Sequence, residues 1–502
     1  MLQEEITMRL TNKHILPALA ALLLLSQTAC GSQTQTEGTA AVTGDAAATE
    51  TAAVTEDPGY DYAGKDFGGA ELNILNFDSF YNAYVYLDFE GTSGEMLDDA
   101  VYNRNRRVEE ALNFKLSEVK YQYNGWQDSQ EALIDTVTKS VMAADYAYDA
   151  AYLPVAFKSS VITDGYLYDM YELPGMQLDQ PWWDHYINDA LELNGHLYAA
   201  SSPLHLQTLD MSDVLLFNEK MFTNMGMDFP YQLVRDGKWT LDKFHEYIAA
   251  LTQLNGDSSF TFTSTGNSVY GVAVHPDLIF AMTYSAGQRL AEKTDTGFRL
   301  TLEGERWYNV ADKLANMLHR ESGYALDNTD DETDSYYTKL FRLGRAAFVT
   351  AEIKMTMELR DMEDTFGLLP MPKYDEAQED YYTVTGYSTA LLTVPSVIEN
   401  PEMVGWALDA LSYDSWKSVL PIYYDVRLEQ KGLRNEDSIA MLDIVRSSLA
   451  AEPTLMLGIA YNYVSAMDDA ILNGNVNIAS LAASHTKNLE KNIQLVADAF
   501  AD

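Results

Sequence analysis

The fold is decided by ELNILNF at residues 71–77, KLSEVKY at residues 115–121 and YDAAYLP at residues 148–154. Apolar and polar residues alternate in the first two segments, as they do in half-buried strands, and the third is a further candidate strand. A stretch long enough for a helix separates each segment from the next. The order strand, helix, strand, helix, strand predicts a parallel sheet covered by helices.

The two intervening helices are predicted from different signals. The first spans residues 94–112, and one apolar face carries Leu97, Ala100, Val101, Val108, Ala111 and Leu112. The second is expected to begin near Asp128, because Asp128 and Glu131 have the spacing of a capping box. In a sheet of this kind the ligand site normally lies in a crevice beyond the carboxyl ends of the strands.

The middle of the chain shows a similar pattern, so a second lobe of the same class is expected. DVLLF at residues 213–217 and YGVAVH at residues 270–275 are predicted strands, and Thr240 begins a predicted helix between them. Further apolar runs lie at residues 346–350, 366–369 and 389–394, and a helix is expected at residues 401–411.

Composition excludes several classes of protein. The 502 residues include 33 Lys and Arg against 75 Asp and Glu, a net charge of −42 that would repel a phosphate backbone, so nucleic-acid binding is disfavoured. The single cysteine forms no intramolecular disulfide and no thiolate cluster for a metal. We therefore expect no resident metal and no cofactor.

The N-terminus has the outline of an export signal. ILPALAALLLL at residues 15–25 follows Arg9 and Lys13, and at about 1.5 Å of rise per residue it is too short to span a membrane of roughly 30 Å. Cys30, the only cysteine, comes just after this run and follows Thr28 and Ala29, which resembles the lipobox of bacterial lipoproteins. Residues 1–29 are thus a predicted lipoprotein signal peptide with Cys30 as the lipidation site. The alternatives are an ordinary secretory signal and a buried free thiol.

The segment that follows Cys30 has almost nothing to pack. Residues 31–57 contain no aromatic residue and no Leu, Ile, Met, Lys or Arg, so they bury too little surface to offset the entropy of ordering. We expect a disordered tether at residues 30–59.

Eight segments in a fixed order resemble the bacterial extracellular solute-binding proteins of family 1, sugar-binding lipoproteins that serve ABC importers. They are LDDAVYNRNRRVEEALNF (97–114), QPWWD (180–184), LNGHLYAAS (193–201), LLFNEKMF (215–222), DGKWTLDKF (236–244), GRAAFV (344–349), LLPMPKYDEAQEDYY (368–382) and RNEDSIAMLD (434–443).

This resemblance implies a two-lobed periplasmic-binding-protein-like fold of type II. Each lobe would be a mostly parallel α/β sheet flanked by helices, and hinge strands would join the lobes. The implied division places residues 60–205 and 383–412 in lobe 1, and residues 206–382 and 413–502 in lobe 2. It also implies a monomer, lipid-anchored outside a bacterial cell membrane, which takes a small solute to permease subunits and catalyses nothing.

Candidate ligand contacts come from two arguments. Sugars are held by aromatic faces flanked by carboxylates and amides, so the loops after the first-lobe strands offer Asp78, Tyr81 and Phe157. The resemblance adds residues on the crossing segments and at the start of the second lobe: Asp210, His275, Asp277, Glu352 and Tyr387. For each of them the alternative is ordinary, namely a solvated acid, a packed aromatic ring or a histidine satisfied at a strand end.

Two other groups of residues are conspicuous but point to structure. Trp182 and Trp183 stand ahead of a helix, where packing is favoured over ligand stacking. Arg104, Arg106 and Arg107 are candidates for a cationic pocket, but on a helix they are expected to pair with acids such as Glu109 and Glu110.

The main enzymatic alternative is a lipid-anchored glycoside hydrolase, which needs two carboxyl groups about 5 to 10 Å apart. The sequence selects no such pair. His245 and Glu246 lack the second histidine of a metalloprotease helix, and the acidic loop at residues 327–334 lacks the glycine of a calcium-binding loop. Phosphate-loop and serine-hydrolase motifs are absent, and no tandem repeats suggest an adhesin. The sequence therefore favours binding of a small solute without catalysis, and a carbohydrate is the expected class of solute.

Overall fold

The computed structural model describes residues 57–154, 159–260, 266–319, 325–326, 336–386, 389–433, 435–474 and 477–501. The predicted signal peptide, Cys30 and all but the last three residues of the predicted tether lie outside these ranges, as does the acidic loop at residues 327–334. Asp57, near the end of that tether, forms an ion pair with Lys417 at 2.7 Å and accepts a hydrogen bond from the Tyr413 hydroxyl at 3.0 Å.

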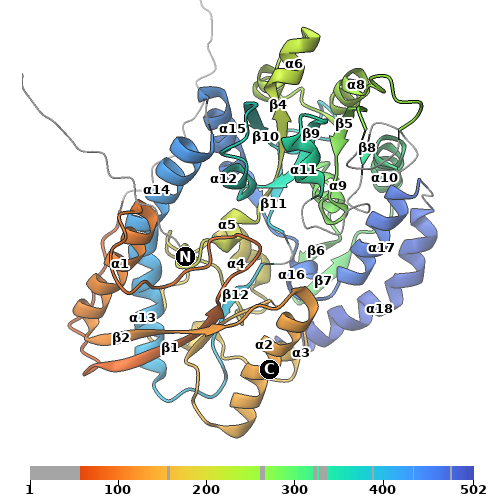
Figure 1. The fold of residues 1–502 in the computed structure, drawn as a ribbon. Helices are drawn as coiled ribbons and strands as arrows, with labels where there is room; N and C mark the ends of the chain where they lie inside the picture. Colours follow the sequence, from red (N-terminus) through yellow and green to blue (C-terminus); the bar gives the residue numbers. More distant parts are fainter. Residues whose placement is uncertain are drawn as a thin grey trace, which may run out of the picture. The chain divides into compact units, whose positions relative to one another are not determined.

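The first sheet contains the three strands predicted at the start of the chain. Its order is β12 (Leu391–Thr393), β3 (Ala150–Leu153), β1 (Ala70–Phe77) and β2 (Phe114–Tyr121). β1 runs parallel to both β2 and β3, which confirms the parallel arrangement expected from alternating strands and helices. β12 pairs antiparallel with β3 and brings a late segment of the chain into this sheet (Figure 1).

The two connecting helices are α1 (Met96–Leu112) and α2 (Trp126–Ala143). α1 buries Leu97, Ala100, Val101, Val108 and Leu112, as the sequence pattern predicts, whereas Ala111, predicted on the same face, is exposed. The N-cap of α2 is Gly125, three residues before the expected Asp128, and the Gly125 φ of 110° lies in the region that favours glycine. Asp128 is therefore inside the first turn of α2, and the predicted capping box is wrong.

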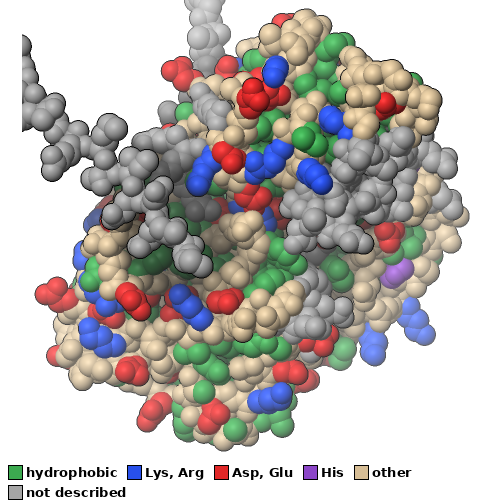
Figure 2. Space-filling model, viewed as in Figure 1, with side chains coloured by type: hydrophobic (Ala, Val, Ile, Leu, Met, Phe, Trp, Pro, Cys, Tyr) green, Lys and Arg blue, Asp and Glu red, His purple; other side chains and the backbone are tan. Residues whose placement is uncertain are grey.

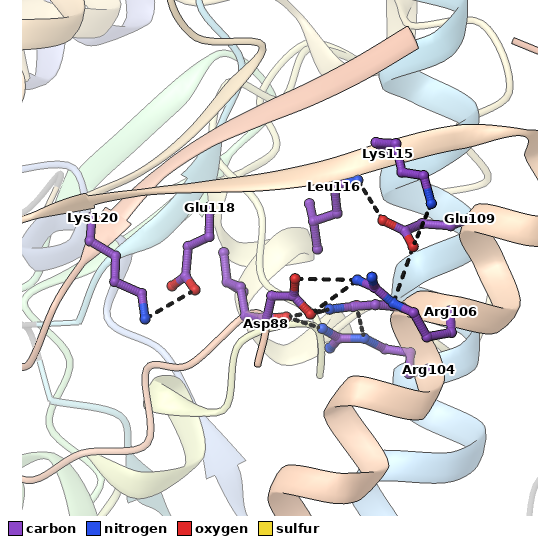
Figure 3. Close-up of polar contacts among 10 residues, drawn as sticks. Asp88, Arg104, Arg106, Glu109, Lys115, Leu116, Glu118 and Lys120 are labelled. Carbon is purple, nitrogen blue, oxygen red and sulfur yellow. Dashed lines mark hydrogen bonds and ion pairs between the residues drawn. The ribbon is translucent and has the colours of Figure 1, made fainter. Parts of the chain in front are cut away.

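Polar side chains of α1 fasten it to the rest of the first lobe (Figure 3). The Arg104 side chain is fully buried, and it donates to the Leu87 carbonyl at 2.6 Å, the Leu204 carbonyl at 3.3 Å and the Ser415 hydroxyl at 3.0 Å. Its neighbour Arg106 pairs with Glu109, as expected, at 3.1 Å.

Two further side chains of α1 bind a strand and a later helix. Glu109 accepts from the Leu116 amide of β2 at 2.8 Å, and Arg107 forms a two-bond pair with Asp414. All three arginines of α1 thus have partners inside the fold, and none of them forms a cationic pocket.

The second sheet is mixed. Its order is β10 (Phe366–Leu369), β4 (Asp213–Asn218), β9 (Ala346–Glu352), β5 (Tyr270–Ala273) and β8 (Ala325–Leu326). β4 runs antiparallel to β10 and β9, whereas β5 runs parallel to β9 and β8. The expectation of a mostly parallel sheet in this lobe is therefore wrong, because the chain enters β4 at the end of the sheet where β9 finishes.

Helices flank the second sheet (Figure 1). α8 (Leu241–Leu251) packs on β5 and β9, and its first turn is capped by the Thr240 hydroxyl, as predicted. α15 (Glu436–Ser447) packs on β10. The remaining elements of this half are α6 (Glu219–Met225), α7 (Tyr231–Arg235), η3 (Pro276–Leu278), α9 (Ile279–Ser285), β6 (Ala291–Thr294), β7 (Gly297–Leu300), α10 (Glu305–Leu318), α11 (Tyr336–Arg342), α12 (Met355–Glu358), α16 (Pro453–Met456), α17 (Tyr461–Leu472) and α18 (Ile478–Ala499).

Segments from three parts of the chain run between the two sheets. β11 (Thr383–Val384) pairs in parallel with β13 (Leu449–Ala450), and Thr385 also bridges Ser212, which directly precedes β4. α5 (Gln207–Asp210) leads into the same place. The other elements that connect or cover the first lobe are α3 (Ser160–Thr163), η2 (Met170–Glu172), α4 (His185–Leu191), α13 (Pro401–Asp414), η4 (Ser415–Val419), α14 (Leu420–Ile422) and η5 (Tyr423–Gly432).

The two adjacent tryptophans are structural, as predicted. Trp182 and Trp183 are 1% and 2% exposed, and both indole nitrogens donate to the same oxygen of Asp409 on α13, at 3.1 and 2.9 Å. The backbone amide and the side-chain amide of Gln177 complete the set at 2.9 and 3.0 Å. One buried carboxylate thus holds the QPWWD motif against α13.

No helix in the described part of the chain is long and apolar enough to cross a membrane.

Candidate functional site

Two neighbouring antiparallel strands of the second sheet place charged residues at the same edge of the sheet. β4 begins at Asp213 and β9 ends at Glu352, and the two residues face each other in the register. Lys354 follows β9 and pairs with Glu352 at 3.1 Å. Burial, together with the charges of Glu352 and Asp277, raises the pKa of the Asp213 carboxyl well above its usual range, and the Lys354 charge opposes this rise in part.

His275 and Asp277 join this edge from β5. The His275 amide donates to the Thr350 hydroxyl of β9 at 2.9 Å, and its Nδ1 accepts from the Asp277 amide at 3.2 Å, which caps the short helix η3. The Asp277 side chain stays 58% exposed. Three of the predicted contacts, His275, Asp277 and Glu352, are therefore brought together at the ends of neighbouring strands.

Asp468 also belongs to this region, and sequence reasoning missed it. It lies on α17 among the buried Val464, Met467 and Ile471, and only 3% of it is exposed. Burial first, and then the charge of Asp277, raises the pKa of Asp468 well above its usual range. A carboxylate on the apolar face of a helix, between Val464 and Ile471, is the sequence signal that would have identified it.

The first-lobe contribution is the loop after β1. The Asp78 carboxylate accepts from the Tyr123 amide at 2.8 Å and so ties the ends of β1 and β2 together. Tyr81 and Asn82 follow with φ values of 44° and 61°, in the left-handed region. This turn leaves the Tyr81 ring 43% exposed, edge-on to the Tyr123 ring. Asp78 therefore shapes the loop, and Tyr81 is the residue that it presents.

The two lobes touch through this loop. The Lys354 ammonium lies 5.8 Å from the centre of the Tyr81 ring, and the Asn82 side-chain amide donates to Glu358 on α12 at 3.3 Å. The strand ends of both lobes therefore face each other. Figure 2 shows basic and acidic side chains gathered over the region of α11 and α12, beside a hollow in this face of the molecule.

Asp210 has a different role from the one predicted. It is fully buried, and its carboxylate accepts from the Tyr84 amide at 2.6 Å and from the Tyr423 hydroxyl at 2.7 Å. Its carbonyl also accepts from the Lys354 amide at 3.0 Å. Asp210 thus ties the crossing segment to the β1 loop and to the start of the second lobe. Phe157 and Tyr387 lie outside the described residues.

Among the residues that the structure describes, no group of three or more His, Cys, Asp or Glu side chains is placed to hold a metal ion. The carboxyl groups at the edge lie beside one ammonium group and one aromatic ring. Such a set supplies hydrogen-bond acceptors, a donor and an apolar face, which is the chemistry that polyhydroxylated guests require.

Comparison with known proteins gives a fold. No family model matches the chain, and no curated protein matches it in sequence. An ABC substrate-binding protein from Listeria monocytogenes, solved with cycloalternan, matches with a TM-score of 0.55 and 13% identity, over 85% of this chain and 99% of its own. A cyclo/maltodextrin-binding protein, solved with maltotetraose, matches with a TM-score of 0.56 and 14% identity, over 85% and 98%.

The chain has the fold of the two-lobed solute-binding proteins. UgpB from Mycobacterium tuberculosis, solved with glycerophosphocholine, has the same fold, with a TM-score of 0.52 and 15% identity, over 86% of this chain and 99% of its own. The predicted α/β, two-lobed fold class is therefore confirmed. In the solute-binding fold of this chain, the charged edge lies where the second lobe meets the β1 loop of the first.

Proposed function

We propose that this chain is the substrate-binding component of an ABC importer and that it captures a carbohydrate between its two lobes without altering it. The proposal rests on one observation: Tyr81 and Asn82 of the first lobe meet Lys354 and Glu358 of the second at the ends of the strands. A guest held there touches both lobes at once, so its binding energy favours the closed arrangement.

The contacts that we assign to the guest follow from exposure and chemistry. Tyr81 supplies an exposed ring for the apolar face of a sugar, while Asp277, Glu352 and His275 supply polar groups. Asp78 ties the ends of β1 and β2 beside the loop that carries Tyr81, and Asp210 ties that loop to the backbone of Lys354. Phe157 and Tyr387 remain predicted contacts. The lobe limits at residues 205, 382 and 412 also remain predictions.

Two kinds of support favour a carbohydrate over other solutes. The Listeria protein and the cyclo/maltodextrin-binding protein were solved with oligosaccharides, and both are binding proteins. The charge of −42 also disfavours strongly anionic guests. UgpB was solved with a different kind of guest, so the fold alone does not fix the choice.

The cellular setting is part of the same proposal. Lipidation at Cys30 would anchor the protein outside the cell membrane, and the tether would let a monomer deliver its guest to the permease subunits. Incorporation of a labelled fatty acid, lost in the Cys30→Ser variant, tests the anchor independently of guest binding.

The binding claim is tested by thermal-shift screening and calorimetry of the purified protein against mono- and oligosaccharides. A guest stabilises the protein by RT ln(1 + [L]/Kd), and it should be recovered intact by mass spectrometry. Asp213 and Glu352 lie opposite each other on neighbouring strands. They are therefore the pair of carboxyl groups that the alternative, a glycoside hydrolase, would use. Hydrolysis that disappears in either the Asp213→Asn or the Glu352→Gln variant would establish that alternative and refute ours.

A further inference from the structure

The two halves of the molecule also meet at a place away from the β1 loop. α18 packs on α10, α17 and β7, in the half that holds the second sheet, and it also packs on α3 of the first lobe (Figure 1). The β6–β7 hairpin lies so close to α18 that a Cβ atom on Gly297 would come within 3.2 Å of the Ala497 Cβ atom. α18 and this hairpin are therefore packed together and in contact with the first lobe.

A tight turn at residues 193–196 of the first lobe presents polar groups to the hairpin and to α18. Its outer residues pair in an antiparallel bridge, and Asn194 and Gly195 between them have φ values of 53° and 82°. Asn-Gly is a sequence that such two-residue turns prefer. The Glu192 carboxylate accepts from the Gly195 amide at 2.7 Å. The turn thus fixes the positions of the Glu192 carboxylate and the Asn194 side chain.

Three hydrogen bonds join this part of the first lobe to the hairpin and to α18. The Lys293 ammonium on β6 donates to the Glu192 carboxylate at 2.7 Å and to the Asp189 carbonyl, in the last turn of α4, at 2.8 Å. The Asn194 side-chain amide donates to the Phe500 carbonyl, just after α18, at 3.0 Å. We call Glu192, Asn194, Lys293 and Phe500 the clasp.

The clasp is partly shielded from water. The side chains of Lys293 and Glu192 are 36% and 28% exposed. Phe500 is 1% exposed, and its ring lies edge-on to the Tyr198 ring with the ring centres 4.8 Å apart. Hydrogen bonds between charged groups are stronger than neutral ones, and a cation is favourable at the carboxyl end of a helix. The clasp therefore stabilises the arrangement of the lobes in which it forms.

We propose that the clasp ties the two lobes together and restricts their movement, in addition to the crossing segments. It is formed in the same arrangement as the contacts of Tyr81 with Lys354 and of Asn82 with Glu358. Figure 1 places α12, which carries Glu358, and the β6–β7 hairpin on different sides of β11. A rotation of the lobes about the crossing segments that changes one set of contacts must then change the other. The effect of the clasp on guest affinity rests on the proposed function, whereas its effect on lobe movement does not.

The test measures the distance between the lobes in the absence of a guest. Met142 on α2 and Leu343 after α11 are 72% and 57% exposed and lie outside both the clasp and the candidate site. Met142→Cys and Leu343→Cys are introduced into the full chain together with Cys30→Ser, so that only these two positions are spin-labelled. Double electron–electron resonance then gives the distribution of distances. With Lys293 present, we expect most molecules to have the distance of the described arrangement.

Variants at Lys293 separate the clasp from the overall charge of the protein. Lys293→Glu places a carboxylate against Glu192, and we expect the ratio of molecules at the described distance to all others to fall roughly five- to tenfold. Lys293→Arg keeps the charge and should keep the distribution. Lys243→Glu is the matched control, because Lys243 pairs at 2.6 Å with Glu246 inside α8, and it should leave the distribution unchanged. Circular dichroism verifies folding, and Lys293→Met, with an expected fall of about twofold, replaces Lys293→Glu if the latter does not fold.

The distances and the affinities decide different questions. An unchanged distribution in the Lys293→Glu variant overturns the inference, as does an equal shift in Lys243→Glu. For a sugar that binds the parent protein, calorimetry should show an affinity weakened by the factor by which the population of the described arrangement falls. A tighter affinity would overturn the inference, because the clasp would then oppose the arrangement that holds the guest. If no sugar binds, the proposed function fails, and the distances still decide whether the clasp ties the lobes.

Discussion

Replacing Asp409 tests whether one buried carboxylate holds the first lobe together. The side chain is fully buried and accepts four hydrogen bonds, three of them on the same oxygen, from Gln177, Trp182 and Trp183. Asp409→Ala leaves these donors buried without an acceptor. Burial also raises the pKa of Asp409, so ionising it in the folded state offsets part of the gain from its donors. Each buried donor that loses its acceptor costs about 1–3 kcal/mol, so we expect the unfolding free energy to fall by about 3–5 kcal/mol.

The Asn variant sharpens the prediction. Asp409→Asn keeps the oxygen that accepts three of the four bonds, and the Gln177 side-chain amide needs only to flip to accept from the new NH2 group. We therefore expect a smaller loss of about 1–2 kcal/mol. Urea unfolding followed by circular dichroism measures both variants, with Asp228→Asn as a surface control within about 0.5 kcal/mol of the parent. An Ala variant as stable as the parent, or an Asn variant as unstable as the Ala variant, would refute the reasoning.

Three other predictions use the same purified protein. Arg104→Met should lower the unfolding free energy by about 2–4 kcal/mol, because the Leu87 carbonyl and its other buried acceptors lose their donor; a loss below 1 kcal/mol in urea would contradict this. Burial raises the pKa of Asp184 to about 6, so its contribution to stability is complete below about pH 4 and is lost as the pH rises through 6. Because Asp184 keeps partial exposure, we expect Asp184→Asn to remove about 1–2 kcal/mol of this decline between pH 4 and 7, and parallel pH profiles of the two proteins would be the opposing result. Asn82→Ala removes the bond to Glu358 that joins the lobes, and calorimetry should show a two- to fivefold weaker affinity for any sugar that binds; an unchanged affinity would exclude a role for this bond in closure.

The first lobe was predictable because its signals are local. Alternation in β1 and β2 and the apolar face of α1 each arise within fewer than twenty residues, and short connections then fix the parallel order. The capping box failed because Gly125 starts α2 earlier, through a backbone conformation that outweighs a side-chain cap. The prediction of strand direction in the second sheet was wrong for another reason. The reversal of β4 depends on where the chain enters the lobe, which no local pattern records.

The candidate site was predictable in part. His275, Asp277 and Glu352 follow strand ends, and strand ends of one sheet meet at one edge, so their assembly follows from topology. Asp210 was placed in the same region, yet its acceptors are used by Tyr84 and Tyr423, more than 100 residues away on either side. Contacts over such separations are a property of the folded chain, and alternation or motif spacing does not reveal them.

The central claim is that a guest is held between the lobes, and small-angle X-ray scattering tests it most directly. The purified protein is measured alone and with a saturating concentration of the sugar that binds most tightly, at several protein concentrations. We predict a smaller radius of gyration with the guest, because contacts to Tyr81 on one lobe and Glu352 on the other favour closure. A sugar that saturates the protein by calorimetry yet leaves the scattering curve unchanged would contradict the claim.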